Sequence, residues 1–216
     1  MAIMNNGSIF SFKGKIGNLV FCNWKGQTYV RSAPESRKRT KSTLQLGNNS
    51  KFKQLQELLS KILPYIRLGF KNYHPEWSSH NSAMSYNLKN AFDEHSKKNN
   101  INWSSLSISR GLINPITSFN IEMNLESTSL KVLWTYDEEI VKAFDMENYR
   151  CMLLLQPENT EINKVFGLVN GNLISEESQE IYFDKLTPQD IYHVYLAFLS
   201  NDGSYQCTDS KYLGKI

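Results

Sequence analysis

Two short patterns contain residue types that bind metal ions or phosphate groups. His74, Glu76 and His80 are close in sequence, and imidazole and carboxylate groups are common zinc ligands. Their HxExxxH spacing does not present all three side chains from one helical face, so we expect no metal site there. The segment Gly14-Lys15-Ile16-Gly17 lacks the GxxxxGKS/T spacing that aims backbone donors at phosphates, and we predict a turn instead.

Residues suited to covalent or acid–base catalysis are equally sparse. A nucleophile needs a base within hydrogen-bond reach, and no Ser, Thr or Cys lies in a recognisable nucleophile signature. The adjacent carboxylates Asp137, Glu138 and Glu139 are expected in a loop, where such groups are usually solvated. This loop and a second one at 201–202 are candidate contacts to a partner. Their residues are Asp137, Glu138, Glu139, Asn201 and Asp202. We expect no catalytic, cofactor-binding or metal-binding residues and no enzymatic activity; a site assembled from scattered residues is the alternative.

Basic residues are concentrated toward the N-terminus. Residues 1–74 hold thirteen Lys or Arg against two Glu, whereas residues 75–216 hold eleven against nineteen acidic residues, giving net charges of +11 and −8. The candidate contacts to nucleic acid or an acidic partner are Arg31, Arg37, Lys38, Arg39, Lys41, Lys51 and Lys53. Trp24 and Tyr29 nearby could stack on bases. We favour a solvated face or a protein contact, because no helix-turn-helix, RNP or zinc-finger signature accompanies these charges.

The composition is that of a globular protein. Hydrophobic residues make up 40% of the 216 residues and charged residues 21%, and no stretch approaches the ~18 apolar residues that span a bilayer. The first residues lack the apolar run of a signal peptide, so we expect a cytoplasmic product. Cys22, Cys151 and Cys207 are widely spaced and form no CxxC pair, and we expect buried free thiols.

The N-terminal part, residues 1–115, is predicted to be an α+β module with a β-hairpin and two helices. Strands at 16–23 and 28–32 flank the turn Trp24-Lys25-Gly26-Gln27, and a polar stretch at 33–49 reads as an extended basic arm. Apolar residues at spacings of three and four predict a helix that begins after Asn49 or Ser50 and is kinked or restarted at Pro64. A second helix is expected at 79–95.

From residue 116 the periodicity changes from helical to alternating. Asn114-Pro115 marks the expected boundary, and turn-forming residues separate the segments that follow. The predicted strands are 118–124, 129–135, 149–156, 162–169, 179–184, 191–200 and 205–213. Seven short strands indicate an all-β sandwich over residues 116–216.

Three segments of this region resemble fibronectin type III domains, an Ig-like sandwich fold. Residues 186–194 (LTPQDIYHV) resemble the entry to strand F, residues 130–134 (LKVLW) resemble strand B, and residues 149–153 (YRCML) resemble strand C. The resemblance implies that Trp134 packs between the two sheets and that Tyr192 is a tyrosine-corner residue. Both aromatic side chains are therefore expected in the core.

The whole chain is also similar to a domain-of-unknown-function family of Bacteroidetes proteins. The resemblance rests on FKGKIGN at 12–18, WKG at 24–26, VRS at 30–32, GFK at 69–71, AMSYN at 83–87 and SRG at 109–111. Where family members often have Pro in the basic arm, this chain has Lys41-Ser42, so a rigid turn is not implied there. The family has no established activity, and the resemblance implies organisation rather than function.

The leading hypothesis is a non-enzymatic protein-interaction or assembly module. Its partner is another protein or a second copy, and the opposite charges of the two halves favour head-to-tail association. The alternative is a nucleic-acid-binding protein of phage or mobile-element origin that uses the basic arm. No small-molecule substrate is indicated.

Overall fold

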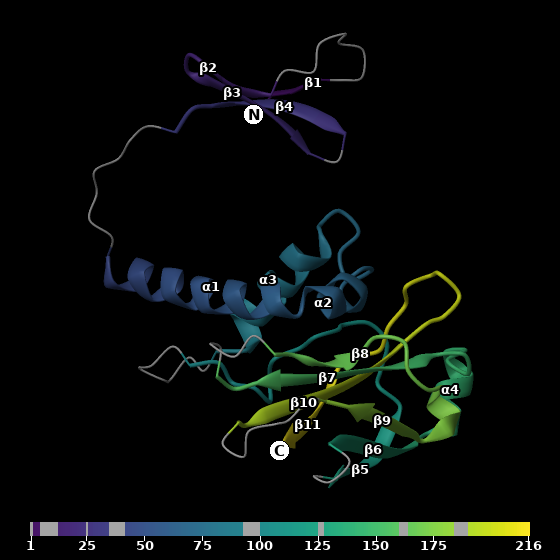
Figure 1. The fold of residues 1–216 in the computed structure, drawn as a ribbon. Helices are drawn as coiled ribbons and strands as arrows, with labels where there is room; N and C mark the ends of the chain where they lie inside the picture. The colour runs from purple at the N-terminus through teal and green to yellow at the C-terminus, as the bar shows by residue number, and fades with distance from the viewer. Residues whose placement is uncertain are drawn as a thin grey trace. The chain divides into compact units, whose positions relative to one another are not determined.

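The computed structural model describes residues 2–4, 13–24, 26–34, 42–92, 100–124, 128–159, 164–183 and 190–216. The chain divides into two compact units, Met1–Ser42 and Thr43–Ile216. The overall class is mixed α+β, as the sequence predicted, with an N-terminal sheet and helices followed by antiparallel sheets (Figure 1).

The first unit is a four-stranded antiparallel sheet in the order β1-β4-β3-β2. Its strands are β1 (Ala2–Met4), β2 (Gly14–Ile16), β3 (Leu19–Trp24) and β4 (Gln27–Ser32). The predicted hairpin is confirmed as β3 and β4, but its connection is shorter than expected because Trp24 pairs with Gln27. Gly26 supplies a φ of +78° at this tight turn, a conformation that L side chains rarely adopt. Sequence patterns missed β1 and β2, since three residues are too few to show alternation.

Three helices begin the second unit: α1 (Thr43–Lys61), α2 (Leu63–Gly69) and α3 (Ser79–Asn90). The predicted start of the first helix was wrong, and the predicted extended arm is helical from Thr43 onward. No residue of α1 before Leu55 is buried, so the apolar stripe that marks a helix appears only in its second half. Pro64 lies in the first turn of α2 and therefore restarts the helix, and Ser78 caps α3.

Seven strands of the described chain follow, in two antiparallel sheets with the orders β5-β6-β9 and β11-β10-β7-β8. They are β5 (Ile116–Asn124), β6 (Ser129–Tyr136), β7 (Arg150–Pro157), β8 (Phe166–Leu168), β9 (Ser178–Tyr182), β10 (Tyr192–Leu199) and β11 (Lys211–Lys215). The short helices α4 (Glu138–Ala143) and η1 (Ile174–Glu176) were not predicted. Strand β11 begins later than expected, because Cys207 and Thr208 make only an isolated bridge to β10 and the amides of Asp209 and Ser210 bond to the segment 109–112.

Residues of both sheets form one hydrophobic core. Trp134 is buried there, donates its indole N–H to the Ile174 carbonyl at 3.0 Å, and meets Phe198 edge-on at 5.5 Å. Tyr192 is buried in the same core, as predicted. A tyrosine corner also needs a hydrogen bond from the Tyr192 hydroxyl to the backbone a few residues upstream, and residues 184–189 lie outside the described residues.

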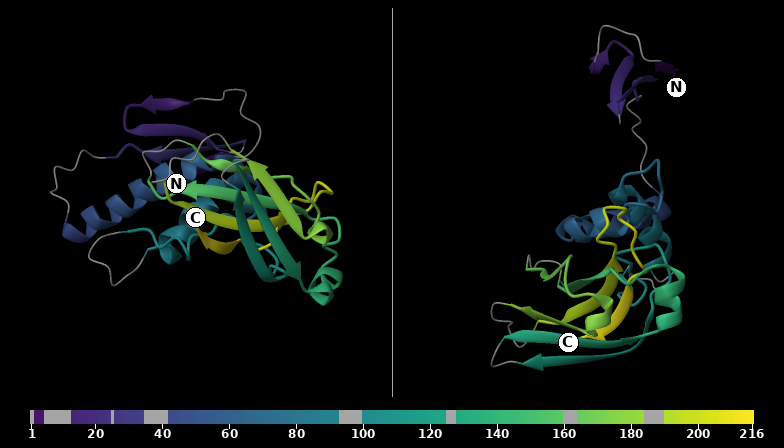
Figure 2. Two further views of the ribbon diagram at one scale, coloured as in Figure 1. Left: turned by 60° about the horizontal axis from the view of Figure 1, so that its bottom comes forward. Right: turned by 90° about the vertical axis from the view of Figure 1, so that its right-hand side faces the viewer.

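A second core lies between the helices and the outer face of the sheet β11-β10-β7-β8. Met152 and Leu154 of β7 and Tyr195 and Ala197 of β10 pack there with the apolar residues of α1, α2 and α3. The right-hand view of Figure 2 shows the helical layer over the sheets. The boundary expected at residues 115/116 therefore lies inside one compact unit, because helices and sandwich share a core. Within the described residues, no helix is both long and apolar enough to cross a membrane.

This shared core predicts that helices and strands unfold together. Leu153 and Leu154 are neighbours and fully buried, but on opposite faces of β7. We expect Leu153→Ala and Leu154→Ala each to lower the unfolding free energy by about 2–5 kcal/mol, as buried Leu→Ala changes do. Urea unfolding followed by circular dichroism and tryptophan fluorescence should give coincident transitions for both variants. A separate early loss of helix in Leu154→Ala would contradict a single cooperative unit.

Candidate functional site

The acidic residues expected in a loop after β6 instead begin helix α4. Asp137 is its N-cap, and its carboxylate accepts hydrogen bonds from the amides of Glu139 at 2.9 Å and Ile140 at 3.3 Å. Glu138 pairs with Lys142 one turn later at 2.9 Å, and both side chains are exposed. These carboxylates stabilise a helix start, which corrects their interpretation as a loop.

Asn201 and Asp202 do lie in a loop, between β10 and β11. The Asp202 carboxylate accepts hydrogen bonds from the Ser200 hydroxyl and from the Ser204 amide, the latter at 2.8 Å. The hydroxyls of Ser200 and Ser204 and the Ser204 amide lower the pKa of Asp202 to about 2. The carboxylate therefore holds the turn that carries the exposed Asn201.

The basic candidates belong to different parts of the chain. Arg37, Lys38, Arg39 and Lys41 lie outside the described residues. Arg31 is exposed on β4 of the first unit, whereas Lys51 and Lys53 are on α1 of the second. The Lys51 ammonium lies 5.5 Å from the centre of the Phe92 ring, and that of Lys53 lies 3.8 Å from Glu57.

The histidines considered for metal binding have other neighbours. His74 stacks on Trp77 with ring centres 4.3 Å apart, and His80 lies 3.4 Å from the Gln56 amide nitrogen. In the part of the chain that the structure describes, no three His, Cys, Asp or Glu residues are grouped so as to hold a metal ion.

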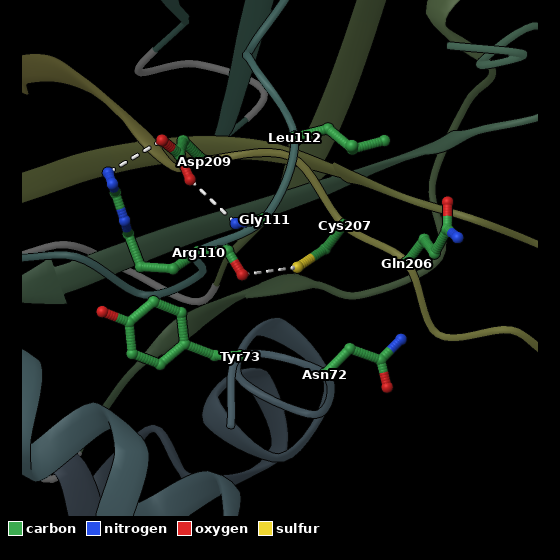
Figure 3. A pocket seen from close by; sticks show the side chains of 8 residues that line it. All are labelled: Asn72, Tyr73, Arg110, Gly111, Leu112, Gln206, Cys207 and Asp209. Atoms are coloured by element: carbon green, nitrogen blue, oxygen red, sulfur yellow. Dashed lines mark hydrogen bonds and ion pairs between the residues drawn. The ribbon is translucent and has the colours of Figure 1, made fainter. Parts of the chain in front are cut away.

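A pocket of about 370 Å³ lies beside Arg110 (Figure 3). Its lining residues are Asn72, Tyr73, Arg110, Gly111, Leu112, Gln206, Cys207 and Asp209. The Arg110 guanidinium pairs with Asp209 at 2.8 Å and lies over the Tyr86 ring at 4.8 Å. The other Asp209 oxygen accepts from the Gly111 amide at 2.8 Å. The cation in this pocket is therefore already neutralised from within the fold.

The backbone around this pocket joins the helical layer to the end of the sandwich. The Cys207 thiol donates to the carbonyls of Gly69 and Arg110, and burial raises its pKa to about 12, so it is a protonated structural group at neutral pH. A Cβ at Gly111 would collide with the Cys207 carbonyl, and one at Gly69 with the Ile108 carbonyl. The close approach of these segments explains the two glycines.

The first unit presents two faces of different chemistry. None of its described side chains between residues 13 and 34 is buried. Residues opposed across an antiparallel ladder share a face, and alternate residues along a strand do too. The register therefore assigns to one face Gly14, Ile16, Leu19, Phe21, Asn23, Thr28, Val30 and Ser32. The other face carries Lys15, Val20, Cys22, Trp24, Gln27, Tyr29 and Arg31.

We call these the apolar face and the basic face. The apolar face has no charged residue at these positions, and its Ile16 and Leu19 side chains are 61% and 47% exposed. The basic face places Lys15 and Arg31 in one row on either side of Val20, with Tyr29 and Trp24 in the next two rows. It is the site where the structure brings a candidate contact, Arg31, onto one face with Trp24 and Tyr29, the two aromatic residues considered for stacking on bases. Lys15, which sequence reasoning assigned to a turn, joins them because β2 pairs with β3.

Comparison with known proteins gives a family. The model of a family of unknown function, DUF6266, matches residues 11–214. The chain belongs to this family. The match confirms the predicted membership of a family without known function, and it spans both units of the chain. No curated protein sequence matches the chain, and no solved structure matches it.

One polar cluster of this family member escaped the sequence analysis. His193 and Gln156 are opposed on β10 and β7, on the face toward the helices, and both are buried. The His193 ring stacks on Trp103 at 4.4 Å, and its Nδ1 lies 2.9 Å from the Tyr212 hydroxyl. Burial lowers the pKa of His193, with Lys215 contributing and Glu158 opposing. The sequence does contain a signal for this cluster, because Gln156 and His193 are polar residues within otherwise apolar segments.

The buried imidazole predicts a pH dependence of stability. The unfolded chain binds the proton more readily than the folded one, so the stability from a neutral His193 is complete above about pH 6.5 and decreases below it. The unfolding free energy of the wild type should fall between pH 8 and pH 5, and that of His193→Gln should fall less steeply. The two slopes should differ by up to about 1.4 kcal/mol per pH unit. His80→Gln is the control and should keep the full slope. Parallel curves for His193→Gln and the wild type would contradict a neutral buried imidazole.

Proposed function

We propose that the protein is a non-enzymatic assembly module that associates with a second copy through the apolar face of its N-terminal sheet. The observation that carries this proposal is a four-stranded sheet whose described side chains are all at least partly exposed, with one uncharged apolar face. The second unit serves as the scaffold that is brought together.

The proposed scaffold is a fibronectin type III-like sandwich with a helical layer added. In that fold, strand B lies in one sheet and strands C and F lie side by side in the other. Strands β6, β7 and β10 occupy these places in the two sheet orders, with Trp134 on β6 and Tyr192 on β10. These correspondences support the assignment.

The size of the first unit supports a need for a partner. The unit Met1–Ser42 is close to the length of about 40 residues below which domains usually need disulfides, metal ions or oligomerisation, because they bury too little surface. Cys22 is a free thiol, and the residues that the structure describes hold no metal-binding cluster. Burial of the exposed Ile16 and Leu19 side chains in a contact would stabilise that contact by about 25 cal/mol per Å² of apolar surface.

The distribution of charge favours a second copy as the partner. Lys15 and Arg31 lie on the basic face, so two basic faces would repel each other. Two apolar faces carry no such repulsion at their described positions and can meet in a two-fold contact, as sheets of β-sandwiches do. Both basic faces remain outside that contact.

The matched pair Leu19→Asp and Val20→Asp tests this proposal. The residues are adjacent on β3 but point to opposite faces. We expect a dimer of the full chain by sedimentation velocity, weakened about 100-fold or more in Leu19→Asp. A two-fold contact would bury two unpaired carboxylates, each costing at least about 1.4 kcal/mol. Val20→Asp should remain a dimer.

Far-ultraviolet circular dichroism of each variant checks that the sheet is retained. A wild-type protein that is monomeric at every concentration would overturn the proposal. A dimer that dissociates as salt rises and ignores Leu19→Asp would also overturn it, because that behaviour indicates head-to-tail electrostatic association.

A further inference from the structure

We propose that the basic face of the N-terminal sheet binds single-stranded nucleic acid. The surface consists of Lys15, Trp24, Tyr29 and Arg31, none of which lies on the face used in the proposed self-association. The inference goes beyond assembly, because it assigns a ligand class to the opposite side of the same sheet.

The register sets out these side chains in successive rows. Lys15, Val20 and Arg31 oppose one another across β2, β3 and β4; Cys22 and Tyr29 form the next row, and Trp24 and Gln27 the last. Rows two residues apart are separated by about 6.6 Å along the strands. Two cations at one end of the face are therefore followed by an aromatic ring in each of the next two rows.

This order of groups matches what an extended nucleic-acid strand offers. Lys and Arg neutralise phosphates, while aromatic rings on a sheet stack on bases that are not already stacked in a duplex. The Trp24 side chain is 52% exposed, and Lys15 and Arg31 are exposed as well. An acidic protein would pair with the cations but would leave the two rings without a matching partner.

The charge of the whole unit points to the same ligand. Residues 1–42 hold eight Lys or Arg against one Glu, a net charge of +7, whereas residues 43–216 hold sixteen against twenty, a net charge of −4. A polyanion is therefore attracted to the first unit and repelled by the second. Arg110, the pocket cation of the second unit, is in contrast paired with Asp209 at 2.8 Å.

Fluorescence anisotropy with labelled oligonucleotides tests the inference on the full chain. The probes are oligo(dT), oligo(U), a DNA duplex and poly-glutamate, each titrated at several salt concentrations. We expect single strands to bind more tightly than the duplex and poly-glutamate, and their affinity to fall with salt with a slope of about −0.7 per phosphate contact. The two single-stranded probes distinguish DNA from RNA as the preferred ligand.

Variants on the basic face separate stacking from charge. Tyr29→Ala should weaken single-strand binding by about 5- to 150-fold, and Tyr29→Leu should also weaken it, since leucine keeps apolar bulk but has no ring. Arg31→Gln should reduce the salt slope by about 0.7. Thr28→Ala, adjacent to Tyr29 but on the apolar face, and Lys53→Gln on α1 are the controls and should bind as the wild type does.

Several results would overturn the inference. They are the absence of binding to either single strand at low salt, equal affinity for poly-glutamate or duplex, and unchanged binding by Tyr29→Leu and Arg31→Gln with the sheet intact by circular dichroism. The monomeric Leu19→Asp variant should keep binding that depends on Tyr29 and Arg31. Loss of self-association and loss of nucleic-acid binding are thereby distinguished.

Discussion

Strands β7 and β10 must be covered on both faces, because their side chains are apolar almost without alternation. Every residue of β10 is buried, and on β7 only Arg150 is not. One set of alternate residues enters the sandwich core and the other set meets α1, α2 and α3. A sandwich without the helices would expose Met152, Leu154, Tyr195 and Ala197 together. The helical layer is therefore part of the fold of the sheet.

The same constraint accounts for features that otherwise resemble a site. The helices approach the end of the sandwich so closely that Gly69 and Gly111 have no space for a Cβ, and the Cys207 thiol bonds to carbonyls of both connecting segments. Arg110 is neutralised by Asp209 in that joint. The hydrogen bonds and the ion pair of this region therefore join the two layers.

The first unit has the opposite character. Its sheet has no described side chain that is buried, and its two faces differ in charge and in aromatic content. We infer that partners supply what the sheet lacks: a second apolar face on one side and a polyanion on the other. Recognition is thus assigned to the small sheet and structural support to the larger unit.

Sequence patterns predicted five of the seven strands to within two residues at each end, because short alternating segments separated by turn residues are a local signal, whereas β8 and β11 are shorter than predicted. They failed where the deciding contact is distant. The start of α1 was missed because no residue of the helix before Leu55 is buried, and the helix–sheet packing was missed although the unbroken apolar runs of β7 and β10 are typical of strands buried on both faces. Asp137 followed by two glutamates is a helix N-terminus signal that was interpreted as a loop. Trp24, Tyr29 and Arg31 were identified from sequence, but only the strand register shows that they share a face with Lys15.

The location of recognition is the central claim, and hydrogen–deuterium exchange on the intact protein tests it most directly. Exchange would be compared at low and high protein concentration and with and without a single-stranded oligonucleotide. The account predicts that added protection is confined to peptides covering residues 14–32. Protection that appears instead in the segments around Arg110 and Cys207, with none in residues 14–32, would contradict it.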